Sequence, residues 1–143
     1  MFLQDCKFPP NLKDYPATLV AYRQSLDLWR TLSAESVSVA STLIDLASVE
    51  RLSGDLAASE RDFREAPRVA RKVDNAEGVA IFTSNLAALE LGRKNWPQAE
   101  ALAREALPLS EKVGRQELIA EDCRRLAKVL VRQGNASEAL RYA

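Results

Sequence analysis

The sequence predicts an all-α fold, an α-solenoid built from antiparallel helix pairs. One phrase recurs at a fixed interval, because "LASVERLSGD", "LAALELGRKN" and "LAKVLVRQGN" begin at residues 46, 86 and 126. Apolar residues within and around these phrases recur at spacings of three and four, with little strand-like alternation. A helical repeat of about 40 residues is typical of proteins that bury their apolar faces by stacking neighbouring units.

The first predicted element is a half unit over residues 14–33, read as a single helix. Shifted along the chain by slightly more than one period, it overlays the second helix of the next unit, which pairs Tyr22 with Phe63. Pro16 falls in its first turn, where the missing backbone N–H costs little.

Three further units are predicted at about 35–73, 75–113 and 115–143, the last of them truncated. Each unit reads as two helices, so residues 1–143 form a single solenoid domain. An Asp or Asn stands at each break between the two helices, where its side chain can accept a bond from the next first turn: Asp55, Asn95 and Asn135.

Two of these breaks carry further start signals. Asn95 with Gln98, and Asn135 with Glu138, have the spacing of a capping box, and Pro97 falls in the first turn of its helix. We therefore expect the second helix of each unit to begin at these positions.

Composition excludes several classes of protein. Twenty basic residues balance twenty acidic ones, so no excess positive field is present to attract nucleic acid or an acidic membrane surface. No apolar run reaches the roughly 18 residues that span a bilayer, and the start lacks a signal-peptide pattern. Cys6 and Cys123 are too few and too far apart for a disulfide framework. We expect a soluble, cytoplasmic protein.

Enzyme chemistry is not predicted. The chain has no histidine and no nucleotide-binding, nucleophile-elbow or metalloprotease motif, so we expect no catalytic residue, no cofactor and no metal site. Cys123 reads as a small buried apolar residue. Glu50 and Glu90 have two readings: they meet across neighbouring units and raise each other's pKa, or they are polar edge positions of an imperfect repeat.

The chain resembles the tetratricopeptide repeat family over about residues 14–143. The family's Leu-Gly pair is matched by three Leu-Ala pairs, at residues 46–47, 86–87 and 126–127. Its Ala-x3-Phe pattern is matched by Ser59-x3-Phe63, Ala99-x3-Ala103 and Ala139-x3-Ala143. The resemblance implies a right-handed superhelix whose first helices line a concave groove that binds protein segments.

The match also has departures. The family's Trp position holds Leu43, Thr83 and Cys123, and its Tyr position holds Glu50, Glu90 and Leu130. The period, about 40, exceeds the usual 34. In this respect the chain resembles the longer-period repeats of multidomain bacterial regulators and kinesin light chains.

Counting from the Leu-Ala pairs predicts which residues line the groove. These residues recur at helical spacing on the first helix of each unit: Ile44, Ser48, Arg51, Ile81, Asn85, Ala88, Leu91, Arg124, Arg125, Lys128 and Arg132. The four basic ones share much of one helical face, and Glu121 is placed to pair with Arg125.

Two interpretations of this basic face remain open. It is a receptor for an acidic or carboxylate-bearing peptide, because guanidinium groups hold carboxylates in a bidentate fork, or it is a solvated surface. The two-carboxylate clamp of chaperone-binding relatives is matched at Asn85 and Arg125 but not at Ile44, Ser48 and Glu121. We do not predict binding of chaperone tails.

The two ends of the stack support an alternative function. The chain begins with a lone second helix bearing Tyr15, Tyr22 and Trp29, and stops partway through another at "EALRYA". Neither end reads as a capping unit. We expect either a segment of a larger signalling or transcriptional regulator with a structural role, or a homo-oligomer formed through the ends.

Overall fold

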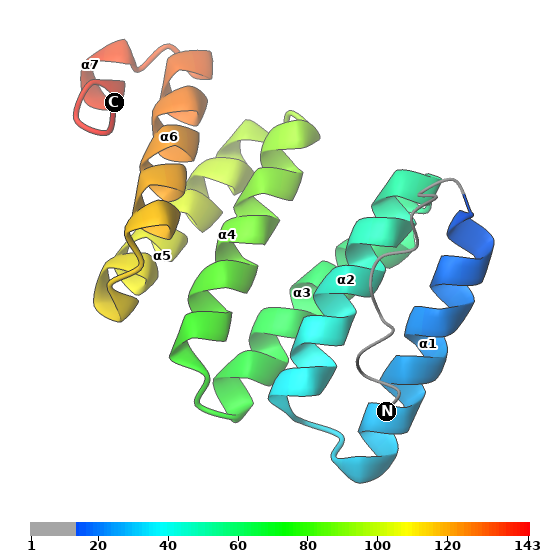
Figure 1. The fold of residues 1–143 in the computed structure, drawn as a ribbon. Helices are drawn as coiled ribbons and strands as arrows, with labels where there is room; N and C mark the ends of the chain where they lie inside the picture. Colours follow the sequence, from blue (N-terminus) through cyan, green and yellow to red (C-terminus); the bar gives the residue numbers. More distant parts are fainter. Residues whose placement is uncertain (1–13) are drawn as a thin grey trace.

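The computed structural model describes residues 14–143, and this part of the chain contains helices and no strand. Figure 1 shows the helices in chain order, from blue α1 to red α7. Their bounds are α1 (Tyr15–Leu32), α2 (Val37–Ser53), α3 (Leu56–Lys72), α4 (Ala76–Gly92), α5 (Trp96–Val113), α6 (Gln116–Arg132) and α7 (Ala136–Ala139). The predicted all-α solenoid is confirmed.

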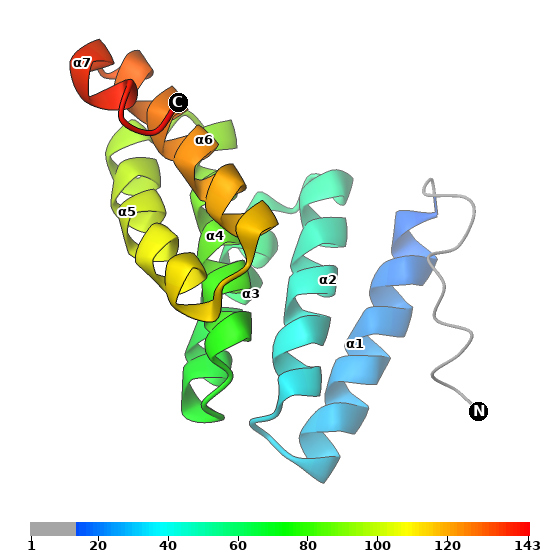
Figure 2. The same cartoon turned by 60° about the vertical axis from the view of Figure 1, so that its left-hand side comes forward.

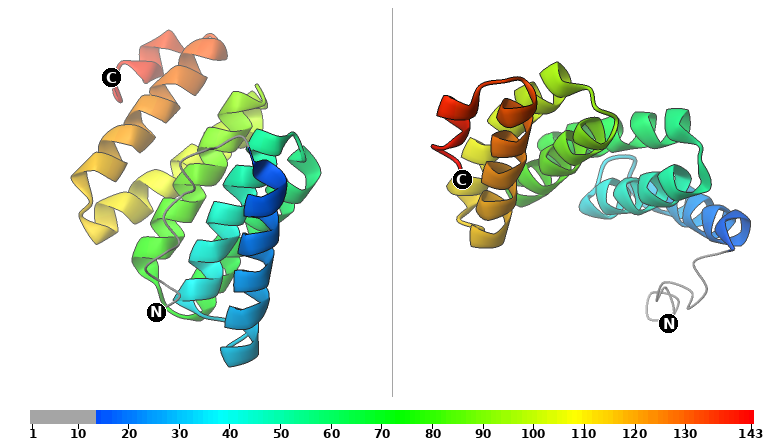
Figure 3. Two further views of the ribbon diagram at one scale, coloured as in Figure 1. Left: turned by 45° about the vertical axis from the view of Figure 1, so that its right-hand side comes forward. Right: turned by 90° about the horizontal axis from the view of Figure 1, so that it is seen from above.

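Each helix packs against the helix before it and runs in the opposite direction, as Figures 1 and 2 show. The backbones of α2, α4 and α6 also come into contact in sequence, whereas those of α1, α3 and α5 do not. We call α2, α4 and α6 the inner helices, because neighbours on the inner side of a curved stack lie closer together. Figure 3 shows the stack bending from α1 to α7.

The helix boundaries follow from local chemistry. Asp55 accepts a bond from the N–H of Ala58 at 3.1 Å, and Asn135 caps α7 in the same way. The preceding residue takes a left-handed conformation at each break, with φ of 93° at Gly54 and 61° at Lys94. Glycine adopts such angles without strain, which explains why it ends the helix at the first break.

One predicted cap is wrong. The side chain of Asn95 makes no capping bond to α5. Its amide instead donates to Oε2 of Glu90 at 2.9 Å, so a buried carboxylate has taken the side chain that the first turn would use.

The core consists of two apolar clusters that follow the stack. The first joins α2, α3 and the start of α4 through residues such as Val39, Val69 and Phe82. The second joins α4, α5 and α6 through residues such as Leu86 and Leu126. Because each inner helix contributes to the clusters on both sides of it, the units cannot bury their apolar surface separately.

No helix in the described range is long and apolar enough to cross a membrane. Cys6 lies outside the described residues.

Candidate functional site

The exposed sides of the inner helices form one surface, which we call the inner face. All three helices run in the same direction, so equivalent positions of the repeat lie at the same level. On α4 the residues Ile81, Asn85, Ala88 and Leu91 are half-buried and alternate with fully buried neighbours. This stripe lies where the sequence placed the middle of the groove.

The flanking helices present their predicted residues with different exposure. On α2, Ile44 and Ser48 are half-buried and Arg51 is exposed. On α6 the basic residues differ, because Arg124, Lys128 and Arg132 are exposed while Arg125 is half-buried.

A groove of about 690 Å³ lies between the C-terminal ends of α2 and α4. It brings together four of the predicted residues with others that sequence reasoning missed: Ser48, Arg51, Asn85 and Ala88, with Leu56, Phe63, Leu89, Gly92 and Arg93. Ile44, Ile81, Leu91 and the basic residues of α6 do not line it. Its walls are mixed, with apolar side chains below and guanidinium groups at the edge.

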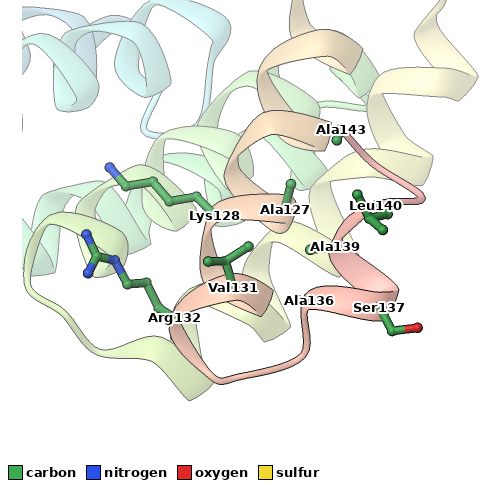
Figure 4. Close-up of a pocket in the computed structure, with 9 residues that line it drawn as sticks. All are labelled: Ala127, Lys128, Val131, Arg132, Ala136, Ser137, Ala139, Leu140 and Ala143. Carbon is green, nitrogen blue, oxygen red and sulfur yellow. The ribbon is translucent and has the colours of Figure 1, made fainter.

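Lys128 and Arg132 line a second depression of about 530 Å³, between α6 and α7. Its floor is apolar and includes Val131 and Leu140. Figure 4 shows the two cationic side chains extending from α6 on the side away from Leu140. The cations therefore border an apolar surface.

Arg125 belongs to a buried polar network that sequence reasoning missed. The hydroxyls of Ser84 and Ser110 donate to the two carboxylate oxygens of Asp122 at 2.5 and 2.6 Å. The guanidinium of Arg125 contacts Ser84, lies 3.3 Å from Asp122, and pairs with Glu121 at 3.3 Å as predicted. Arg125 thus neutralises an Asp122 side chain that is 0% exposed, which limits its freedom to bind a partner.

Three other cations near the inner face have no acidic partner. Within residues 14–143, no carboxylate lies within 4.0 Å of Arg51, Lys128 or Arg132. Arg124 differs, because its guanidinium donates to Glu121 at 2.7 Å and lowers the pKa of that carboxyl. The unpaired cations remain available to a carboxylate from another molecule.

Glu50 and Glu90 follow neither predicted reading, because both are buried and each pairs with an arginine of the preceding outer helix. Arg23 donates to Glu50 and Arg64 donates to Glu90, both at 3.2 Å. The glutamates are 0% and 1% exposed, so they are not edge positions, and neither contacts the other. They hold successive units together.

The described residues offer little for catalysis. No group of three His, Cys, Asp or Glu side chains in residues 14–143 is placed to hold a metal ion. Cys123 is half-buried rather than fully buried, and burial together with Glu111 and Asp122 raises the pKa of its thiol. A thiol with a raised pKa is a poor nucleophile.

Comparison with known proteins agrees with this geometry. The profile of the tetratricopeptide repeat matches residues 39–73 and 80–113. The chain is built from tetratricopeptide repeats. The two matched segments begin at residues 39 and 80, which agrees with the predicted long period.

Among solved structures, the chain is similar to BtubC (BKLC) from P. vanneervenii, with a TM-score of 0.81 and 18% sequence identity. The similarity covers 90% of this chain and 54% of BtubC, so the chain spans about half the length of that protein. No curated protein is a significant match to the sequence. The structural similarity supports the repeat fold.

Proposed function

We propose that this chain is a protein-interaction module that binds an acidic segment of a partner across the C-terminal ends of α2, α4 and α6. Tetratricopeptide repeats generally mediate contacts between proteins, and an extended surface shared by stacked helices suits a chain segment as ligand. The proposal assigns the module no catalytic role. It treats residues 1–143 as one solenoid domain in the cytoplasm, with the unit boundaries that the repeat predicts.

The observation that carries the proposal is the position of the unpaired cations. Ser48, Ala88 and Lys128 lie at one level of the inner helices, since they occupy equivalent positions of the repeat. Arg51 and Arg132 lie within a turn of that level. Cations from the first and last inner helices therefore flank a middle helix that presents only small residues there.

The small residues of α4 leave space for a ligand. A Cβ atom added at Gly92 would meet no atom within 4 Å, so this position is open. A peptide backbone lying over Ala88 and Gly92 would place acidic side chains near Arg51 at one end and near Arg132 at the other. Apolar side chains of the same peptide would reach Phe63 and Leu89 in the groove.

A peptide selection tests the proposal. A library of short random peptides is selected on the immobilised chain, and the acidic content of bound peptides is compared with that of the starting library. We expect enrichment in Asp and Glu. Ala88→Trp, which fills the centre of the path, should abolish capture of the selected peptides.

Matched variants separate binding from helix stability. Lys128→Glu with Arg132→Glu should weaken binding of a selected peptide at least tenfold. Lys112→Glu, an exposed change on outer helix α5, should leave binding unchanged. If basic residues in last turns only stabilise helix ends, the double variant would lower the melting temperature while peptide affinity stayed the same, and the proposal would be wrong.

A further inference from the structure

One side of α6 is open where the equivalent sides of α2 and α4 are covered. Ala40 and Ala80 are both 0% exposed, whereas Ala120, at the same place in the repeat, is exposed. The same contrast separates the buried Val39, Val79, Leu43 and Thr83 from the half-buried Ile119 and Cys123. Helices α3 and α5 cover the first two inner helices over their whole length, but α6 is followed by α7, which has four residues.

Helix α1 has the complementary opening. Its sequence overlays α3, and it packs on α2 as α3 packs on α4. The side with which α3 covers α2 is nevertheless free in α1. Leu28 is 65% exposed and Leu32 is 72% exposed, whereas Val69, the equivalent of Leu28 in α3, is 1% exposed.

These two openings are the two halves of one interface that the molecule already makes twice. Val39 and Val69 share an apolar cluster in the α2–α3 pair, and Val79 and Leu109 meet in the same cluster in the α4–α5 pair. In the repeat, Ile119 is the equivalent of Val39, and Leu28 is the equivalent of Val69. A pairing of α6 with α1 therefore places like residues in like positions.

We propose that α1 of a second copy of this chain packs on the open side of α6, so that copies join head to tail. The added helix takes the place on α6 that α3 takes on α2, and the α2 of the second copy follows it as α4 follows α3. The solenoid then continues from one copy into the next. This surface is separate from the inner face, so the inference does not depend on the proposed peptide binding.

Helix α7 must leave for α1 to enter, because it occupies the first turn of the same position. Its attachments are a cap from Asn135, one buried residue in Ala139, and an ion pair between Arg104 and Glu138 whose side chains are 39% and 27% exposed. A partly exposed ion pair contributes at most about 1 kcal/mol. An 18-residue helix that buries Leu28 and Leu32 outcompetes this single turn.

The contact joins unlike surfaces at opposite ends of the stack, as Figure 1 shows for α1 and α6. Such heterologous contacts generate an open series of oligomers when the rotation does not close a ring. We therefore expect sedimentation of the native chain to show a weight-average mass that rises steadily with concentration. A chain that stays monomeric from micromolar to submillimolar concentration would overturn the proposal.

Two exposed positions on α1 give a matched pair of variants. Leu28→Glu places a charge in the proposed contact and should leave the chain monomeric. Val20→Glu changes a residue that is 52% exposed on the same helix, but its equivalent in α3 is Arg61, whose side chain is 67% exposed. Val20→Glu should associate like the native chain. If both variants associate normally, α1 is not the joining helix.

Mixing experiments test the head-to-tail arrangement directly. Ala120→Glu blocks α6 and should also give a monomer, while Ala101→Glu on the exposed side of α5 should not. Each blocked variant keeps one functional surface, so an equimolar mixture of Leu28→Glu and Ala120→Glu should form a discrete 1:1 dimer. A mixture that remains monomeric, or a Leu28→Glu variant that dimerises alone, would overturn the proposal.

Discussion

The two seams that join the inner helices have the same geometry and opposite chemistry. Three positions face the first seam, and their equivalents one period later face the second. They are Ile44, Ala70 and Phe82 between α2 and α4, and Ser84, Ser110 and Asp122 between α4 and α6. The first trio belongs to an apolar cluster, and the second is a hydrogen-bonded network closed by Arg125. A repeat position is thus defined by volume and by complete bonding, since either chemistry keeps the helices in register.

The glutamates beside the seams differ in a similar way. Glu90 accepts bonds from Arg64 and from Asn95, so both of its oxygens are paired. Glu50 accepts one bond from Arg23, and its Oε2 has no partner within the described residues. Asp55, the equivalent of Asn95, has no amide to donate. A single exchange of Asn for Asp therefore leaves one of two equivalent carboxylates incompletely bonded.

The largest expected effects come from emptying either seam. Phe82→Ala should lower the free energy of unfolding by about 4 kcal/mol, because it removes a buried ring and leaves a cavity. Asp122→Ala should lower it by about 3 kcal/mol, because Ser84, Ser110 and Arg125 lose their shared acceptor. Urea denaturation followed by circular dichroism measures both. A loss below about 1 kcal/mol for Asp122→Ala would show that the network is not complete in solution.

Exchanging the chemistry of a seam should cost much less than breaking it. The triple variant Ser84→Ile, Ser110→Ala, Asp122→Phe gives the second seam the residues of the first. Buried polar groups replaced together by apolar ones often leave stability unchanged or higher. We expect unfolding free energy within about 1 kcal/mol of the native chain or above it. A triple variant less stable than Asp122→Ala would show that the two seams are not interchangeable.

The asparagine beside Glu90 supplies a smaller effect. Asn95→Asp removes a donor and brings a second carboxylate close to a buried one, so it should cost about 1 to 2 kcal/mol. The reverse change, Asp55→Asn, offers Glu50 the donor that it lacks and should leave the chain equally stable or slightly more stable. Equal losses for the two variants, measured by urea denaturation, would contradict the comparison.

The smallest expected effect is a difference in pH dependence. Burial and the nearby Asp62 raise the pKa of Glu50 in the folded chain, against the opposing effect of Arg23. A carboxyl whose pKa is raised by folding stabilises the fold fully below its unfolded pKa, and this contribution is lost as pH rises through the folded value. The native chain should therefore lose more stability than Glu50→Gln as pH rises from 4 to 7. Parallel melting curves for the two chains would show that the pKa is not raised.

Local chemistry explains why most of the fold was predictable. The period of the repeat placed the helices, and the residues that end them, such as Gly54 and Asp55, act within one turn of the chain. Leu-Ala pairs such as Leu86-Ala87 marked the buried side of each inner helix, as their exposures of 5% and 1% confirm. These features depend on neighbours a few residues away, which sequence periodicity records.

The site was less predictable because its side chains choose partners from other helices. Arg125 reads as a surface cation by helical spacing, yet it contacts Ser84 on a different inner helix. Glu50 reads as an edge residue until Arg23 is seen across the helix pair. One signal was present in the sequence: Asp122 and Ser84 replace the apolar Phe82 and Ile44 of the preceding unit. Paired polar exchanges in an apolar repeat position indicate that the two residues bond to each other.

The most direct test of the proposed function reverses the charge of the inner face and measures which peptides bind. The random library is selected in parallel on the native chain and on the Lys128→Glu, Arg132→Glu variant, with circular dichroism confirming equal helix content. We predict that the native chain selects acidic peptides and that the variant selects basic or uncharged ones. The same acidic preference on both chains would contradict the role assigned to these cations.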